Sequence, residues 1–280
     1  MEFDRRVAIV TGAGSGIGRA LAKELARQGA SVTVADIRDE SAEEAAAGIA
    51  ASGGRAKAAH ADVSRAEEVQ RLVDDVVREQ GRLDLMFNNA GIGVGGEIRE
   101  LTLEHWSAVI DVNLRGVVHG VAAAYPVMIR QGAGHIVNIA SLSGLIPSPG
   151  LGPYATTKGA VVSLTGALQA EAEAYGVRAS VVCPGFVDTA IFENAIGVKV
   201  EKEALLKRIA LPLISAEEAA REIVRGMQRN EGVMVFPRSA WVLWRMARWA
   251  PWAMAPLQRR ILKGLRESDS RQRHRDAEKS

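Results

Sequence analysis

The sequence predicts an α/β protein with a doubly wound parallel sheet of seven strands, in one domain that a helical extension follows. The main observation is that short apolar runs alternate with segments of helical period along residues 5–236. Such an alternation implies right-handed crossovers and a parallel sheet. The composition agrees, since 48% of the 280 residues are hydrophobic and 24% are charged. These ordinary globular values exclude disorder, collagen-like repeats and coiled coil for most of the chain.

Each element has its own signal, and the first strand and helix set the pattern. Residues 5–11 contain the continuous apolar run Val7 to Val10, which is typical of a strand buried on both faces. Glycines end this strand, and residues 17–26 have helical apolar spacing. Further strands are expected at 31–35, 56–60, 83–87, 135–140, 178–182 and 232–236, and further helices at about 40–52, 64–80, 103–130, 154–175 and 216–227. Segment 186–215 lacks a clean period up to this last helix and predicts a mobile insertion on the ligand side of the fold.

The last forty-odd residues differ chemically from the rest of the chain. Residues 237–280 carry eleven Lys/Arg and four Asp/Glu, a net charge of +7, so the total of +2 leaves −5 for residues 1–236. Four of the five tryptophans also fall there, which is not expected of a simple solvated basic tail. We therefore divide the chain into an α/β domain at 1–237, a Trp- and Arg-rich helical extension at 238–267, and a charged tail at 268–280 that is expected to be disordered.

The extension has the spacing of a helix that Pro251 ends or kinks. At 100° per residue, one side is expected to carry Trp241, Trp244, Arg245, Arg248 and Trp249, and the other Val242, Leu243, Met246, Ala247 and Ala250. Three roles stay open: cover of an apolar pocket, a subunit contact, or peripheral membrane contact through 238–263, where Trp, Arg and the basic run 259–263 suit anionic lipid. Nucleic acid is not expected, because no recognition motif is present. A membrane-spanning helix is not expected either, since no uninterrupted apolar run reaches about 18 residues.

A glycine turn lies at the first strand-to-helix junction and reads Thr11-Gly12-Ala13-Gly14-Ser15-Gly16-Ile17-Gly18. A helix N-terminus presents unpaired N–H groups, so glycines that admit a close approach suit a pyrophosphate. Asp36 ends the second strand about twenty residues later, where its carboxylate can accept both ribose hydroxyls of an adenosine. This carboxylate would repel a 2′-phosphate, so the pattern favours NAD over NADP, although Arg38 lies close enough to keep NADP open. Asp62 has two readings, a bond to the adenine amine or a cap of the next helix together with Ser64.

Six elements in this order and spacing resemble the short-chain dehydrogenase/reductase family over about residues 5–236. They are the glycine turn, Asn88-Asn89-Ala90-Gly91, Asn113, Ser141, Tyr154-x-x-x-Lys158 and Pro184-Gly185. The resemblance implies a Rossmann-type strand order 3-2-1-4-5-6-7, a cofactor-binding catalytic domain at 1–237, and a homo-oligomer, a dimer or a tetramer. The implied catalytic residues are Asn113, Ser141, Tyr154 and Lys158. The residues expected at the cofactor are Gly12, Ser15, Gly16, Ile17, Gly18, Asp36, Ile37, Asp62, Val63, Asn89, Ala90, Gly91, Tyr154, Lys158, Pro184, Gly185, Val187 and Thr189.

The physical chemistry of the catalytic residues agrees with the resemblance. Tyr154 and Lys158 stand four apart on a predicted helix, so they share a face and the ammonium can stabilise a phenolate. Ser141 would hydrogen-bond and polarise a substrate oxygen. In the family, the residue matching Asn113 holds a water that links the lysine to solvent. No metal is expected, because the five histidines lack ligand spacing. Cys183, the single cysteine, is expected in a buried strand and indicates a reducing, cytoplasmic setting.

We therefore expect an NAD-dependent oxidoreductase that interconverts a secondary alcohol and a ketone, with Tyr154 as general acid and base. The substrate is expected to be bulky and hydrophobic, of sterol, retinoid, terpenoid or lipid type. This expectation depends on the Trp-rich extension and on apolar residues near the expected pocket mouth, namely Leu145, Ile146, Leu151, Ile191 and Phe192. Two alternatives stay open: an NADPH-dependent carbonyl reductase, and a nucleotide-bound sensor or scaffold that turns over no alcohol.

Overall fold

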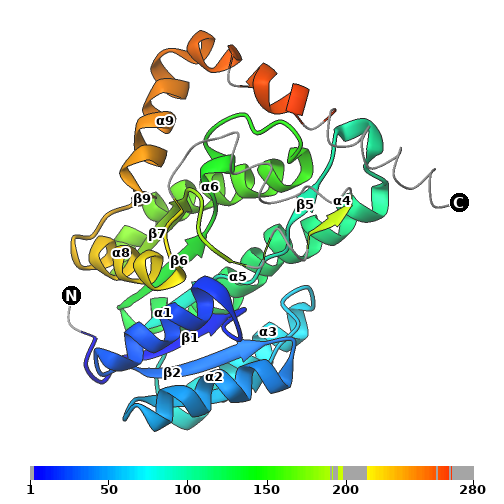
Figure 1. Ribbon diagram of the computed structural model, residues 1–280. Helices are drawn as coiled ribbons and strands as arrows, with labels where there is room; N and C mark the ends of the chain where they lie inside the picture. The colour runs from blue at the N-terminus through cyan, green and yellow to red at the C-terminus, as the bar shows by residue number, and fades with distance from the viewer. Residues whose placement is uncertain are drawn as a thin grey trace, which may run out of the picture.

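A seven-stranded parallel sheet forms the centre of the computed structural model, which describes residues 3–189, 191, 195–197, 213–256, 258–264 and 266 (Figure 1). Its strands are β1 (Val7–Thr11), β2 (Ser31–Asp36), β3 (Arg55–His60), β4 (Leu85–Asn88), β6 (Gly134–Ile139), β7 (Val177–Pro184) and β9 (Val233–Phe236). They lie in the order β3-β2-β1-β4-β6-β7-β9, and every pair is parallel. The predicted order 3-2-1-4-5-6-7 is therefore confirmed, with β6, β7 and β9 as the fifth to seventh strands.

Helices cover both faces of the sheet, and β1 shows why its sequence is apolar throughout. Ala8 and Val10 point into a core shared with α1, α2 and α8, whereas Val7 and Ile9 point into a core shared with α3, α5 and α6. All four side chains are buried, so the run needs apolar residues on both faces. The helices are α1 (Gly16–Arg27), α2 (Asp39–Ala51), α3 (Ala66–Gln80), α4 (Leu103–Ile110), α5 (Gly116–Gln131), α6 (Gly152–Ala172), α8 (Ala216–Gln228) and α9 (Arg238–Trp249).

The long helix expected at 103–130 is interrupted. A π-helical turn at Asp111–Arg115 separates α4 from α5, and such turns are frequent at functional sites. The whole run Leu103–Gln131 is long and apolar enough to cross a membrane by length and composition alone. However, 44% of its most apolar window is buried inside the protein, and α5 packs on β4, β6 and α3. These contacts are those of a core helix.

Part of the expected insertion is described, and it forms structure that the sequence did not predict. β5 (Val94–Gly95) and β8 (Ile196–Gly197) pair as a small parallel sheet near α4 (Figure 1). Most of segment 186–215, including Phe192, lies outside the described residues, as does the expected tail at 268–280. The mobility predicted for segment 186–215 and the disorder predicted for the tail at 268–280 stay predictions.

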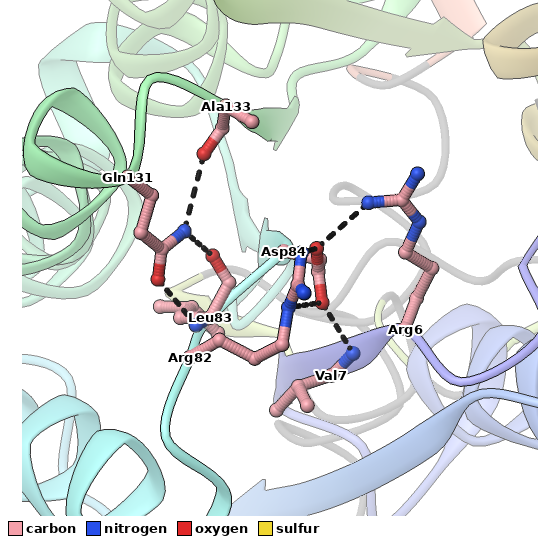
Figure 2. A network of polar contacts seen from close by, with 7 residues as sticks. All are labelled: Arg6, Val7, Arg82, Leu83, Asp84, Gln131 and Ala133. Atoms are coloured by element: carbon pink, nitrogen blue, oxygen red, sulfur yellow. Dashed lines mark hydrogen bonds and ion pairs between the residues drawn. The ribbon is translucent and has the colours of Figure 1, made fainter.

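The amino-terminal edge of the sheet is held by a buried carboxylate, Asp84 (Figure 2). Its Oδ2 accepts the Val7 N–H at 2.9 Å, and its two oxygens pair with Arg6 at 2.9 Å and with Arg82 at 2.6 and 2.9 Å. These partners hold the pKa of Asp84 below its usual value although burial opposes them. In the same network the Gln131 amide bonds both backbone groups of Leu83. The residues of this network stabilise the fold at the edge opposite to the predicted site.

The extension rises from the sheet as α9, turns at a 3₁₀ segment (Pro251–Met254), and continues as helical residues within 255–266 above α6 (Figure 1). The prediction that Pro251 ends the helix is confirmed. The spacing divided the helix into two sides without saying which one faces the protein. Trp244 faces inward with Ala240, Leu243 and Ala247, while Val242 and Met246 are exposed beside Trp241 and Trp249. The packing of the helix against β9 decides its rotation, and the spacing of Trp and Arg does not.

Candidate active site

Asp36 fixes the glycine turn against the end of β2. It is 5% exposed, its Oδ2 accepts the Gly14 N–H at 2.9 Å, and its Oδ1 accepts the Arg38 N–H at 3.1 Å. The Arg38 guanidinium lies 3.6 Å from the same oxygen and donates to Ser15 Oγ at 3.3 Å. Each carboxylate oxygen keeps a free lone pair. Ile37 is 57% exposed at the adjacent position.

The glycine turn, which we call the glycine cradle, packs so closely on its neighbours that side chains would not fit. A Cβ on Gly12 would lie 2.8 Å from the Ala90 Cα, and one on Gly18 would overlap the Gly12 carbonyl oxygen. Gly12 and Gly16 have φ values of +62° and +53°, which L side chains rarely adopt. Ser15 precedes α1 without a side-chain capping bond, so it does not satisfy the first N–H groups of the helix. The residues present therefore fit a dinucleotide pyrophosphate.

Thr11 and Asn89 lock this turn to the neighbouring strand β4. The Thr11 hydroxyl donates to the Phe87 carbonyl at 3.2 Å and accepts the N–H groups of Asn89 and Ala90 at 3.0 and 3.2 Å. In return, Asn89 Nδ2 donates to the Thr11 carbonyl at 2.8 Å and to the Gly12 carbonyl at 3.2 Å. The carboxyl ends of β1 and β4 are thereby fixed relative to each other, which is the geometry of a rigid ligand site.

Tyr154 and Lys158 lie on one face of α6 and are both buried. Lys158 Nζ donates to the Ile139 carbonyl at 2.8 Å and lies 5.7 Å from the centre of the Tyr154 ring. Ser141 follows β6 and caps the short 3₁₀ turn Leu142–Gly144, where its Oγ accepts the Ser143 N–H at 3.2 Å. Its side chain also lies close enough to Tyr154 to act on the pKa of the phenol. The structure therefore brings these three predicted side chains together at the carboxyl edge of the sheet.

Burial sets the protonation of this group. It raises the pKa of Tyr154 to about 12, while the hydrogen bond from Ser141 acts in the opposite direction. It lowers the pKa of Lys158 to about 8, with the neighbouring Cys183 acting to raise it. The buried Cys183 thiol has its own pKa raised to about 12 by burial. The expected effect of Lys158 on the phenolate is thus outweighed here, because desolvation is the largest influence on both groups.

Asn113 completes the cluster from the π-helical turn. It is fully buried, its Oδ1 accepts the Ile92 N–H at 2.8 Å, and its Nδ2 donates to the Ile92 carbonyl at 2.9 Å. Gly91 lies between this amide and the lysine, since a Cβ there would stand 3.2 Å from Asn113 Oδ1 and 3.5 Å from Lys158 Nζ. The amide therefore fixes the segment after β4, and its part in a water relay stays a prediction.

The remaining predicted cofactor residues fall into two groups. Asp62 Oδ1 accepts from Ser64 N and Oγ at 2.9 and 2.7 Å, so it forms a turn before α3, which begins at Ala66 rather than at Ser64. The N-cap of α3 is Arg65 and no side chain caps it, so the capping alternative is wrong, and the adenine alternative stays a prediction. The second group lies around the end of β7, where the Gly185 N–H donates to the Phe236 carbonyl at 2.7 Å. Thr189 lies opposite Gly16, within 3.3 Å of a Cβ placed there. The other predicted members are Ile17, which is partly buried, and Val63, Pro184 and Val187, which are buried.

An apolar cluster surrounds Tyr154. Val94 and Val109 are its other buried members, and Leu151 and Ile191 pack against it together with Ile92, Leu101 and Ile196. Leu151 and Ile191 are thus placed as predicted, whereas Leu145 packs in a separate cluster with Val161 and Cys183. An apolar surrounding of this kind is typical of small-molecule sites.

Sequence reasoning missed two features of the site. Gly14 was not among the predicted residues, although a Cβ on it would stand 2.9 Å from the Asp36 carboxylate and 2.6 Å from Ser41. The available signal was its place as the second of the four glycines in the turn. The second feature is an ion pair between Glu97, just after β5, and Arg266, with contacts of 2.8 and 3.1 Å. It joins positions 169 apart, and nothing in the sequence signals it. Within the described residues, no group of three or more His, Cys, Asp or Glu could hold a metal.

Comparison with known proteins identifies the family. The family model "short chain dehydrogenase" matches residues 6–197. The chain belongs to the short-chain dehydrogenase family. A solved structure, a short-chain dehydrogenase/reductase from Burkholderia phymatum in complex with NAD, superimposes with a TM-score of 0.82 at 32% identity over 92% of this chain and 96% of that one.

Several curated oxidoreductases are similar in sequence. The cyclohexanol dehydrogenase of Acinetobacter sp. (strain SE19) is 41% identical over 71% of this chain and 80% of that protein. The meso-2,3-butanediol dehydrogenase of Serratia marcescens is 39% identical over 68% of this chain and 74% of that protein. The probable oxidoreductase EphD of Mycobacterium tuberculosis is 36% identical over 90% of this chain but only 44% of its own length, so the chain spans less than half of that relative.

Proposed function

We propose that this protein is an NAD-dependent dehydrogenase that interconverts a secondary alcohol and a ketone. The observation that carries the proposal is the convergence of Tyr154, Lys158, Ser141 and Asn113 at the carboxyl edge of the sheet, beside a glycine cradle that ends at Asp36. The NAD-bound Burkholderia phymatum structure and the two alcohol dehydrogenases among the relatives support it. As the carboxylate that would meet the adenosine ribose, Asp36 favours NAD over NADP.

The side chains divide the work of alcohol oxidation as follows. Ser141 has one hydroxyl hydrogen, which it donates to the substrate oxygen when substrate is bound, and this bond orients the substrate hydroxyl for deprotonation by Tyr154. Tyr154 accepts the hydroxyl proton at its phenolic oxygen, and Lys158 stabilises the phenolate by its positive charge. The glycine turn and Asp36 would hold NAD⁺, which would supply the hydride acceptor for the carbinol carbon and a positive charge that favours the phenolate. In ketone reduction Tyr154 returns the proton.

We further propose that the substrate is bulky and apolar. Leu151, Ile191 and the other apolar side chains packed around Tyr154 support this, since they offer few polar partners. A cytoplasmic location is supported by the free, buried Cys183. A homo-oligomer is the assembly we expect from the family.

The test is a panel of secondary alcohols, from cyclohexanol and 2,3-butanediol to a sterol and a long-chain 2-alcohol, assayed with NAD⁺ and with NADP⁺. Turnover with NAD⁺ that rises with the apolar size of the alcohol is expected. Tighter binding of NADPH than of NADH would favour the carbonyl reductase instead. Tight NADH binding with no turnover of any alcohol would favour the sensor or scaffold.

A further inference from the structure

The C-terminal extension crosses the carboxyl edge of the sheet, where the site lies. α9 begins directly after β9, and the Gly185 position faces Ala240, since a Cβ on Gly185 would stand 2.9 Å from the Ala240 Cβ. After α9 the chain turns and continues above α6 (Figure 1). It is held at its far end by Arg266, which pairs with Glu97 through both carboxylate oxygens. Met254 is 2% exposed within the turn. The extension therefore has an inner face that packs on the protein and an outer face that points away.

The outer face exposes large apolar side chains. Trp249 and Trp252 are 71% and 78% exposed, and Trp241, Val242 and Met246 are each more than 40% exposed. No other segment of the described residues gathers exposed tryptophan. Burial of a tryptophan ring stabilises a protein more than burial of almost any other side chain. Several exposed tryptophans on one face therefore indicate an interaction surface.

Cations are interspersed with these rings. The Arg245 guanidinium lies between Trp241 and Trp249, at 5.4 and 5.8 Å from their ring centres. Between Glu231 and Glu267 the sequence has seven Lys/Arg and no Asp/Glu. Arg266 is paired to Glu97, and among the described residues no carboxylate lies within ion-pair distance of the other six, which are Arg238, Arg245, Arg248, Arg259, Arg260 and Lys263.

We infer that this outer face, defined by Trp241, Val242, Arg245, Met246, Arg248, Trp249 and Trp252, docks on an anionic lipid bilayer. Tryptophan and arginine are the side chains that the membrane interface accepts best, and an unpaired cationic set complements anionic headgroups. A second copy docking through the same face would place cations against cations, because a twofold interface is self-complementary. The charge of the face therefore favours lipid over self-association. This inference does not depend on the proposed reaction.

The experiment is flotation of the full-length chain with vesicles of phosphatidylcholine alone or mixed with phosphatidylglycerol. Binding to the mixed vesicles, weak binding to phosphatidylcholine alone, and loss of binding in high salt are expected. The tryptophan emission should shift to the blue on binding, because four of the five tryptophans lie in the extension.

Two double variants separate the two components of the surface. Trp249→Ser/Trp252→Ser should lower the partition coefficient at least about tenfold, because both rings lose their interfacial contact. Arg245→Gln/Arg248→Gln should lower it roughly 30-fold, from about fivefold per cation near an anionic surface. Leu103→Ser, which changes a 79% exposed apolar residue elsewhere, and Lys23→Gln/Arg71→Gln, which removes two exposed cations from other helices, are matched controls that should bind like the wild type.

The inference is overturned if the wild type stays unbound on mixed vesicles, or if the controls lose as much binding as the extension variants. A light-scattering mass that falls only in the Trp249→Ser/Trp252→Ser variant, without vesicle binding by the wild type, would assign the face to a subunit contact instead. Vesicle binding is measured without substrate or cofactor, so its failure is distinct from a failure of the proposed dehydrogenase activity.

Discussion

Replacing Asp36 by Asn should switch the preferred cofactor. The change removes the negative charge but keeps the shape, and the amide oxygen can still accept the Gly14 N–H that Asp36 now accepts at 2.9 Å. A 2′-phosphate carries about 1.5 negative charges or more. At a separation of about 5 Å and an effective dielectric constant of about 20, its repulsion by the carboxylate is about 5 kcal/mol. Arg38, 3.6 Å from Asp36 Oδ1, is present in both proteins, so its attraction for the phosphate cancels from this difference. Screening by salt at physiological ionic strength lowers the repulsion to about 2–3 kcal/mol.

The variant should therefore bind NADPH about 30- to 150-fold more tightly than the wild type. It should bind NADH roughly tenfold more weakly, since a charged acceptor of the ribose hydroxyls becomes neutral. Fluorescence titration with both reduced cofactors measures these affinities. Asp39→Asn removes a carboxylate from the nearby start of α2 and is the matched control, expected to change neither affinity. In Asp36→Asn/Arg38→Gln most of the NADPH gain should vanish. An unchanged affinity ratio in Asp36→Asn would refute the assignment of Asp36.

Three further predictions concern single side chains. Ser141→Ala should shift the rising limb of the pH profile of kcat/KM for alcohol oxidation to higher pH, because the Ser141 side chain lowers the pKa of Tyr154. A rising limb at the same pH in the variant and the wild type would contradict this. Asp84→Asn should lower the free energy of unfolding by about 2–4 kcal/mol in urea, since Arg6 and Arg82 lose their buried partner while remaining partly exposed; a change near zero would show that the network in Figure 2 contributes little. Burial lowers the pKa of His135 to about 3 from 6.5, so the unfolded chain binds more protons and stability is lost as the pH falls below 6.5. Between about pH 8 and about pH 5 the wild type should therefore lose about 2 kcal/mol more than His135→Gln, and parallel losses would contradict this.

Much of the fold could be predicted because its signals are local. The apolar run of β1 and the glycines after it specify a buried strand and a turn, and the parallel order follows from the alternation of strands and helices. The π-helical turn at Asp111–Arg115 could not be predicted, because residues 103–130 keep an uninterrupted helical pattern. Its cause is tertiary, since the Asn113 amide is held by both backbone groups of Ile92.

The candidate site was predicted as a set of residues, but contacts between distant segments were not. The spacing of Tyr154 and Lys158 places both on one face of a helix, whereas their burial depends on other elements. Val94 and Val109 pack with Tyr154, and Lys158 bonds the Ile139 carbonyl. The pairing of Glu97 with Arg266 has the same origin. The periodicity of α9 predicted a helix correctly. It could not predict that Trp244 faces the protein, because this orientation depends on the contact of α9 with β9.

The most direct test of the account is hydride transfer itself. Cyclohexanol deuterated at its carbinol carbon would be incubated with NAD⁺ and the enzyme. The deuterium content of the NADH formed would be measured by mass spectrometry. The account predicts one deuterium in each NADH from the wild type, and no product from Tyr154→Phe although that variant still binds NADH. NADH formation by Tyr154→Phe at the wild-type rate, or NADH without deuterium, would contradict it.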